Sequence, residues 1–308
     1  MVQAELPVPA GAGGLPVAKM IEAARRVVIG RVRDVEVVAA ALGAGRSILL
    51  EGPPGTGKTT LLRALAAGAG LPLVVVEGNA ELSPGRLIGQ HDPSQLLTSG
   101  YTPDTFMPGP LLEAMVAGAL LYVEELNRVP EETLNVLLGV LSERSLHVPR
   151  YGEVAAADDF RLVAAMNPYD TVGTGRVSPA LYDRTCRVAV GYQDEADETA
   201  IVGRQGDAPG GLVQAAVRAA RATRSHPDLR TGSSVRGALD LVAVTLLLDG
   251  IRNGASSGWR QVGLDAALTS LSGRVTRREG TKRTVEEIVT EIWEQVSQPE
   301  EAPGEGKA

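Results

Sequence analysis

The segment from Gly52 to Thr59 reads Gly-Pro-Pro-Gly-Thr-Gly-Lys-Thr and directly follows the apolar run 47–50. A loop this rich in glycine can turn its backbone N–H groups inward around a chain of phosphates. The lysine supplies a charge to the β- and γ-phosphates, and the hydroxyl that follows can ligate Mg²⁺. We therefore predict a nucleotide phosphate site built from Pro54, Gly55, Thr56, Gly57, Lys58, Thr59 and Thr60.

An acidic pair, Glu124 and Glu125, ends the apolar run 120–123. Ligands of open α/β sheets bind at the carboxyl ends of strands, and adjacent strand residues point in opposite directions. We expect Glu124 to face Mg²⁺ and Glu125 to orient and deprotonate an attacking water. Alone, the pair would be two solvated acids at a strand end, but the phosphate loop earlier in the chain favours the catalytic interpretation.

Three further polar residues stand where they could meet the same phosphates. Asn167 follows the run 161–166 and could hydrogen-bond the attacking water, or simply form an Asn-Pro turn. Arg184 ends a predicted short helix, where it could reach the γ-phosphate of a neighbouring subunit or cap its own helix. Arg236 lies in the first turn of a predicted helix, against the helix dipole, which suggests an anionic partner: the γ-phosphate or a surface carboxylate.

A sheet has to bring these strand ends together. Apolar runs without polar alternation predict parallel strands covered on both faces, at 47–51, 73–77, 119–124, 161–166 and 187–190. Helical patterns lie between them, over 58–67 and after Pro130, where leucines recur at helical spacing. The predicted fold class is α/β, a P-loop three-layer α/β/α domain with a five-stranded parallel sheet.

A second domain follows the sheet. The strand signal stops near Asp194, and helical runs follow over 195–205, 212–224, 235–248, 262–271 and 284–296. We predict an α/β domain over 17–193, a hinge at 190–194 and a smaller all-α lid domain over 194–296. Long loops interrupt the first domain at 79–110 and at 145–160, the latter a predicted hairpin around Tyr151-Gly152. Residues 1–16 are predicted to be a flexible lead and 297–308 a disordered tail.

Composition narrows the function classes. The 308 residues carry a formal net charge of −7, which disfavours a dedicated nucleic-acid binder. A single cysteine, Cys186, excludes an intramolecular disulfide, and its apolar segment predicts that it packs as a small hydrophobe. The three histidines lack metal-ligand spacing. No apolar run of membrane-spanning length and no secretory signal are present, so we expect a cytoplasmic protein.

Taken in order, these motifs resemble those of AAA+ ATPases: Walker A, Walker B, sensor 1 at Asn167, the arginine finger at Arg184 and sensor 2 at Arg236. The segments LLEGPPGTGKT and AAMNP, with the stretch 106–144, resemble the MoxR family in particular. The resemblance implies ATP hydrolysis with Mg²⁺ and places adenine at Val28, Ile29 and Gly30. It also implies a ring, usually a hexamer, whose pore is faced by the helix 2 insertion (79–110) and the hairpin before sensor 1 (145–160).

The MoxR resemblance further implies a protein client and a partner with a von Willebrand factor A domain, acting in metal-cofactor insertion or enzyme maturation. Two other functions stay open: a DNA-acting motor, which the acidic charge disfavours, and a nucleotide-regulated scaffold with little turnover. The sequence departs from the family where Glu124 replaces the commoner Asp and where Thr185 and Cys186 replace an aromatic residue. Arg176 rivals Arg184 for the role in a neighbouring subunit.

Overall fold

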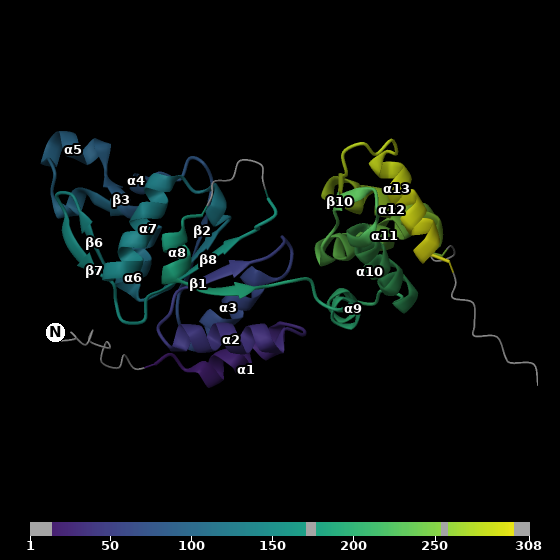
Figure 1. The fold of residues 1–308 in the computed structure, drawn as a ribbon, viewed down its shortest axis with the longest axis horizontal. Helices are drawn as coiled ribbons and strands as arrows, with labels where there is room; N and C mark the ends of the chain where they lie inside the picture. Colours follow the sequence, from purple (N-terminus) through teal and green to yellow (C-terminus); the bar gives the residue numbers. More distant parts are fainter. Residues whose placement is uncertain (1–13, 171–176, 254–257, 299–308) are drawn as a thin grey trace, which may run out of the picture. The chain divides into compact units, whose positions relative to one another are not determined.

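The computed structural model describes residues 14–170, 177–253 and 258–298 (Figure 1). The chain divides into two compact units, Met1–Gly191 and Tyr192–Ala308. The division falls within the segment 190–194 that we expect to act as a hinge. Most of the predicted lead and tail, and Arg176, lie outside the described residues.

The first unit contains the predicted five-stranded parallel sheet. Its strands run in the order β2 (Leu73–Glu77), β5 (Leu120–Glu124), β8 (Arg161–Met166), β1 (Ile48–Glu51) and β9 (Cys186–Ala189). Every neighbouring pair is parallel. The carboxyl ends of β1, β5 and β8 therefore lie side by side at one edge, which confirms the predicted α/β fold class.

Helices cover both faces of this sheet, and Figure 1 shows them on opposite sides. On one face, Ile48 and Leu50 pack with α1 (Val17–Val27), α2 (Val32–Gly43) and α3 (Lys58–Ala69). On the other, Leu49 packs with residues of α6 (Pro110–Ala117) and α7 (Glu131–Glu143). Because alternate residues enter different cores, both sets are apolar, which explains why the strands lack polar alternation.

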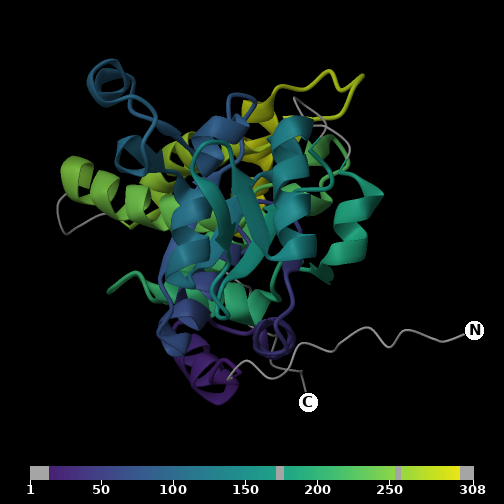
Figure 2. The same ribbon diagram turned by 90° about the vertical axis from the view of Figure 1, so that its left-hand side faces the viewer.

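The two long loops contain short elements of their own. Segment 79–110 holds α4 (Pro84–Ile88), β3 (Gly89–His91), α5 (Pro93–Ser99), η1 (Pro103–Thr105) and β4 (Phe106–Pro108). In the second loop, β6 (Ser145–Val148) and β7 (Gly152–Ala155) pair as the antiparallel hairpin that the sequence predicts. The loops contact each other, since the Phe106 and Tyr151 ring centroids are 4.7 Å apart. Figure 2 shows the hairpin facing the reader, with α5 projecting outward.

The second unit is mainly helical. Its elements are α9 (Glu195–Gly203), α10 (Gly210–Ser225), β10 (Leu229–Thr231), α11 (Val235–Asn253), α12 (Arg260–Leu271), η4 (Ser272–Arg274), β11 (Thr276–Arg277) and α13 (Val285–Val296). The helices surround one core that includes Leu241, Leu271 and Trp293. The antiparallel ribbon of β10 and β11 refines the predicted all-α lid, because strands this short carry no periodic pattern.

The expectation for Cys186 is wrong. Its side chain is exposed rather than packed as a small hydrophobe. Cys186 lies on β9, the edge strand beside β1, and of the four residues in that strand only Val188 is buried. The apolar run predicts the strand correctly, but an edge position leaves part of its surface uncovered.

Candidate functional site

The glycine-rich loop joins the end of β1 to the start of α3. Gly55 and Gly57 have φ values of +73° and +80°, in the left-handed region that favours glycine. Gly52 is required by space, since a Cβ there would lie 2.0 Å from the Val190 carbonyl oxygen. The helix α3 begins at Lys58, so its free N–H groups open toward the loop. This geometry suits the binding of an anion.

The Lys58 amine lies over the loop from which it projects. Its Nζ donates to the carbonyl oxygens of Gly52 and Pro53, each at 2.9 Å. The buried Thr56 hydroxyl donates to the Pro53 carbonyl at 3.1 Å and ties the loop together. The start of the loop therefore curls back over the ammonium group of Lys58.

The hydroxyl of Thr59 donates a hydrogen bond to Oε1 of Glu124. This contact joins the start of α3 to the end of β5 and brings together the two residues predicted to hold Mg²⁺. A hydroxyl and a carboxylate suit this hard cation, which commonly keeps several water ligands besides one or two protein groups. Among the described residues there is no cluster of three His, Cys, Asp or Glu side chains that would form a protein-only metal cage.

Glu125 leaves the strand in a left-handed conformation, with φ of +50°. Its Oε2 lies 3.2 Å from Nε of Arg128. Nη2 of the same arginine lies 2.8 Å from Oδ2 of Asp170. The hydrogen bond to Asp170, and then the charge of Glu125, raises the pKa of Arg128. Arg128 and Asp170 are not among the predicted site residues; the i, i+3 spacing of Glu125 and Arg128 was the available signal.

Asn167 follows β8 at the same sheet edge. Its side-chain oxygen accepts a hydrogen bond from the Tyr169 backbone N–H at 3.2 Å, so the turn considered for this residue is present. Its carbonyl accepts a hydrogen bond from the side chain of Asn127, a buried residue that is also not among the predicted site residues. The Gly52 N–H donates to the Met166 carbonyl at 3.1 Å, which fixes this turn beside the phosphate loop.

Arg184 is exposed at the end of α8 (Pro179–Arg184). Its Nε donates to the Ser142 hydroxyl at 2.7 Å, and another guanidinium nitrogen donates to the Ala180 carbonyl at 3.0 Å. The second contact is the helix-capping role considered as the alternative. Arg184 therefore sits on the surface formed by α7 and α8.

The helix that carries Arg184 is anchored next to the phosphate loop. Tyr182 donates to Oε1 of the buried Glu51 at 2.8 Å, and Arg187 pairs with the other oxygen of that carboxylate. Desolvation of the phenol, followed by this hydrogen bond, raises the pKa of Tyr182 to about 12. Since Glu51 immediately precedes Gly52, one carboxylate links β1, β9 and α8.

The remaining predicted residues belong to other elements. Val28, Ile29 and Gly30 form the partly buried connection between α1 and α2, where Gly30 has φ of +64°. Arg236 belongs to the second unit and is exposed in the first turn of α11. It makes no hydrogen bond or ion pair within the part of the chain that the structure describes, so the surface carboxylate considered as its partner is not found there.

The phosphate-loop region matches a known family. Residues 47–185 match the AAA domain of the dynein-related subfamily. An uncharacterized protein from Staphylococcus aureus (strain USA300) is 32% identical over 208 residues, covering 64% of this chain and 76% of that protein. Gas vesicle ATPase GvpN from Ancylobacter aquaticus is 29% identical over 224 residues, covering 67% of this chain and 62% of GvpN. The chain belongs to the AAA+ ATPases.

Solved structures share the fold at low sequence identity. A candidate ATPase from Cytophaga hutchinsonii is 19% identical, with a TM-score of 0.52 over 90% of this chain and 93% of its own. NtrX from Brucella abortus, solved with ADP, is also 19% identical, with a TM-score of 0.52 over 76% of this chain and 54% of NtrX.

The match to another relative, an uncharacterized protein from Staphylococcus epidermidis (strain ATCC 35984), is 38% identical over 151 residues. It covers 48% of this chain but only 57% of that relative.

In the described ranges, no helix has the length and apolar character needed to cross a lipid bilayer.

Proposed function

We propose that this protein is a MoxR-like ATPase that assembles into a ring, usually a hexamer in this family, and uses Mg-ATP hydrolysis to remodel a protein client. The observation that carries the proposal is the contact between Thr59 and Glu124 beside the Lys58 loop. That contact joins a phosphate-binding turn to an acidic strand end, the two parts needed for phosphoryl transfer to water.

The residues divide the work by position. Lys58 and the N–H groups of the loop would bind the β- and γ-phosphates, while Thr59 and Glu124 would hold Mg²⁺. The bound cation would neutralise charge on the phosphate oxygens. Glu125 would accept a proton from the attacking water, with Asn167 orienting that water and Arg128 placing the carboxylate. Val28, Ile29 and Gly30 would hold the adenine base.

Arg184 and Arg236 would add positive charge near the γ-phosphate. Arg184 would stabilise the γ-phosphate bound by a neighbouring subunit, moving from Ser142 to do so, and Arg236 would sense the phosphate through the second unit. The segments 79–110 and 145–160 would face the pore of the ring. The partner protein would carry a von Willebrand factor A domain. The client would be an enzyme, and the ATPase would assist its maturation or the insertion of its metal cofactor. The complex would act in the cytoplasm.

Nucleotide binding with a Lys58→Ala variant tests the foundation of this proposal. Removing the amine should weaken Mg-ATP binding by roughly tenfold to a hundredfold, because a hydrogen bond to a charged group contributes about 1.5–3 kcal/mol. Titration calorimetry measures this loss. Lys19→Ala, which removes an exposed lysine of α1, should bind as the wild type does. Failure of the wild-type protein to bind Mg-ATP at any protein concentration would contradict the proposal.

A nucleotide-regulated scaffold with little turnover is the second candidate, and Glu124 favours it because its extra methylene alters the geometry open to Mg²⁺. The two functions differ in steady-state turnover. A Glu124→Asp variant that gains turnover over the wild type, with unchanged ATP affinity, would support the scaffold. Substantial wild-type turnover would favour the ATPase that remodels a protein client.

A further inference from the structure

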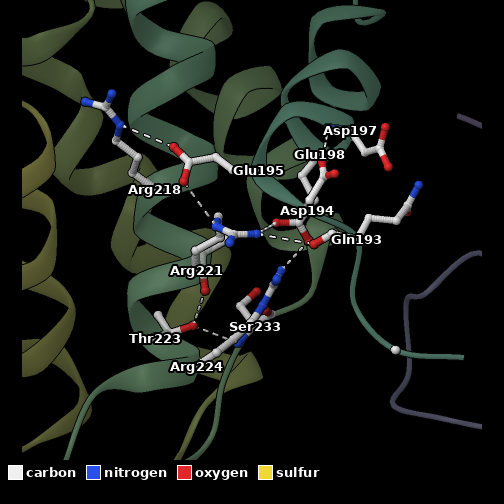
Figure 3. A network of polar contacts seen from close by, with 12 residues as sticks. Gln193, Asp194, Glu195, Asp197, Glu198, Arg218, Arg221, Thr223, Arg224 and Ser233 are labelled. Carbon is white, nitrogen blue, oxygen red and sulfur yellow. Dashed lines mark hydrogen bonds and ion pairs between the residues drawn. The ribbon is translucent and has the colours of Figure 1, made fainter. Parts of the chain in front are cut away.

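A fully enclosed carboxylate organises the second unit (Figure 3). Glu198 of α9 is 2% exposed, and its two oxygens face two arginines of α10. Oε2 lies 3.0 Å from Arg221 and Oε1 lies 2.8 Å from Arg224. A buried carboxylate is costly without charged partners, so these three side chains hold one another in place. We call Glu198, Arg221 and Arg224 the lid clamp.

The lid clamp contacts the segment through which the chain enters the second unit. The guanidinium of Arg224 lies 4.0 Å from the centroid of the Tyr192 ring, and Arg221 donates to the Gln193 carbonyl at 3.3 Å. A guanidinium over an aromatic face is attracted by the ring as well as packed against it. The clamp therefore fixes the first two residues after the division at Gly191.

The same Arg224 also fixes the turn that precedes α11. Its Nε donates to the Ser233 carbonyl at 2.6 Å, and the Ser233 N–H donates to the Thr223 hydroxyl at 2.8 Å. The turn is pressed closely against α10, since a Cβ on Gly232 would lie 2.5 Å from Cα of Arg224. Three residues after Ser233 stands Arg236.

We propose that Arg224 is a positioning residue for Arg236 and couples it to the entry segment at Tyr192 and Gln193. One planar side chain touches α9, the entry segment and the turn before α11, so none of these can shift against the others without breaking its contacts. A displacement of Arg236 by a bound γ-phosphate is then passed to the segment that joins the two units. This inference rests on the proposed function, which gives Arg236 its phosphate.

The test combines Arg224→Lys with Arg236→Ala. Lysine keeps the positive charge near Glu198. Because it lacks the planar, forked guanidinium, it cannot bond Glu198 and the Ser233 carbonyl and stack on the Tyr192 ring at the same time. We expect kcat for ATP to fall about tenfold to a hundredfold in Arg224→Lys, since small misplacements of a catalytic group cost up to about that factor. The affinity for Mg-ATP should stay near the wild-type value, because the phosphate loop is untouched.

The double variant separates positioning from plain stabilisation. If Arg224 acts through Arg236, Arg224→Lys lowers kcat in the wild-type background but not further in the Arg236→Ala background. The loss of thermal stability, by contrast, should be the same in both backgrounds. Arg218→Lys is the matched control, because Arg218 lies on the same helix and pairs with the exposed Glu195 at 3.5 Å. It should leave kcat unchanged.

The possible outcomes are distinct. Wild-type kcat in Arg224→Lys, or an equal fall in both backgrounds, overturns the coupling even if Arg236→Ala is impaired. Wild-type kcat in Arg236→Ala removes the phosphate role of Arg236 itself, and with it the inference. Tyr192→Leu provides a second variant that leaves the buried charges intact. It should lower kcat by a smaller factor than Arg224→Lys, and again only when Arg236 is present.

Discussion

The polar side chains at the sheet edge of the first unit and those inside the second unit are held by different kinds of partner. Lys58 is part-exposed and donates to two backbone carbonyls of its own loop, while Thr59 bonds Glu124 at the loop rim. Glu198 is enclosed, and each of its oxygens faces a different arginine. The side chains at the sheet edge can give up their present hydrogen bonds and bind a ligand instead. The buried ion pairs of Glu198 stabilise the fold of the second unit.

This difference predicts where substitutions act. At the open sheet edge, removing a group should cost binding or turnover and leave the fold almost unchanged. In the enclosed network, removing a group leaves a buried charge without its partner, so stability falls first. Arg184 and Tyr182 test the boundary between the two kinds, because α8 is anchored by the buried Glu51 but presents its arginine at the surface.

The largest effect is expected for Arg184→Ala. An arginine that stabilises phosphoryl transfer from a neighbouring subunit contributes on the order of 10³-fold or more to kcat. Steady-state hydrolysis should therefore be nearly lost, while assembly measured by sedimentation is retained. Mixing this variant with Glu125→Gln subunits should restore turnover, since each supplies what the other lacks.

The control for that experiment is Arg25→Ala, which removes an exposed arginine of α1 that pairs with Glu36. Its turnover should match the wild type. Intact assembly without restored activity in the mixture would show that Arg184 does not act on a neighbouring subunit, and Arg176 would be tested next.

Glu198→Ala should have the next largest effect, and on stability rather than chemistry. Removing the carboxylate leaves the mostly buried guanidinium of Arg224 without its charged partner. Breaking a buried ion pair in this way costs up to about 3–5 kcal/mol. Denaturant unfolding of the second unit measures this loss. Glu195→Ala is the comparison, since Glu195 pairs with Arg218 and Arg221 from a half-exposed position and should cost about 1 kcal/mol or less. Equal losses would remove the distinction between the two regions.

The smallest effect is expected for Tyr182→Phe, which should cost about 1 kcal/mol as one hydrogen bond to Glu51 is lost. The loss should also depend on pH. The pKa of Tyr182 is raised to about 12 in the folded protein, whereas an unfolded tyrosine titrates near pH 10, about its ordinary value. The unfolded chain thus loses its proton first, and stability falls as pH rises through this window.

Wild-type protein should therefore lose more stability than Tyr182→Phe when the pH is raised from about 9 to about 11, with the full benefit present below about pH 10. Urea unfolding at several pH values measures the difference. Tyr169→Phe is the control, since Tyr169 is 78% exposed. If the free energy of unfolding falls equally with pH in wild type and Tyr182→Phe, the hydrogen bond to Glu51 does not cause the loss of stability at alkaline pH.

The open site could be predicted from the sequence because its parts are local. The eight residues from Gly52 to Thr59, three of them glycine, form one signal. The apolar strand that ends in Glu124 and the apolar run before Asn167 form the other two, and each signal lies within a few neighbouring positions. The sheet then follows from five apolar runs, because parallel strands must bring such ends to one edge. Only the resemblance gave Val28, Ile29 and Gly30 their adenine-binding role and placed the two long loops at a pore.

Contacts between residues far apart in the sequence, and the burial of Glu198, could not be predicted in this way. Arg128 meets Asp170 across 42 residues of sequence, and Glu51 meets Tyr182 across 131. Glu198 lies in a short acidic run that resembles any solvated helix start, and only packing against α10 shows that it is buried. The exposure of Cys186 likewise depends on β9 being the outermost strand of the sheet, with a neighbouring strand on one side alone.

Trapping of ATP by Glu125→Gln tests the central claim most directly. Glutamine keeps the shape of Glu125 but cannot accept a proton from water, so the chemical step should slow while the phosphate loop still binds. We predict that a single-turnover experiment finds ATP bound with near wild-type affinity and almost no ADP formed. ADP formation at the wild-type rate would contradict the assignment of the sheet edge as the site of hydrolysis.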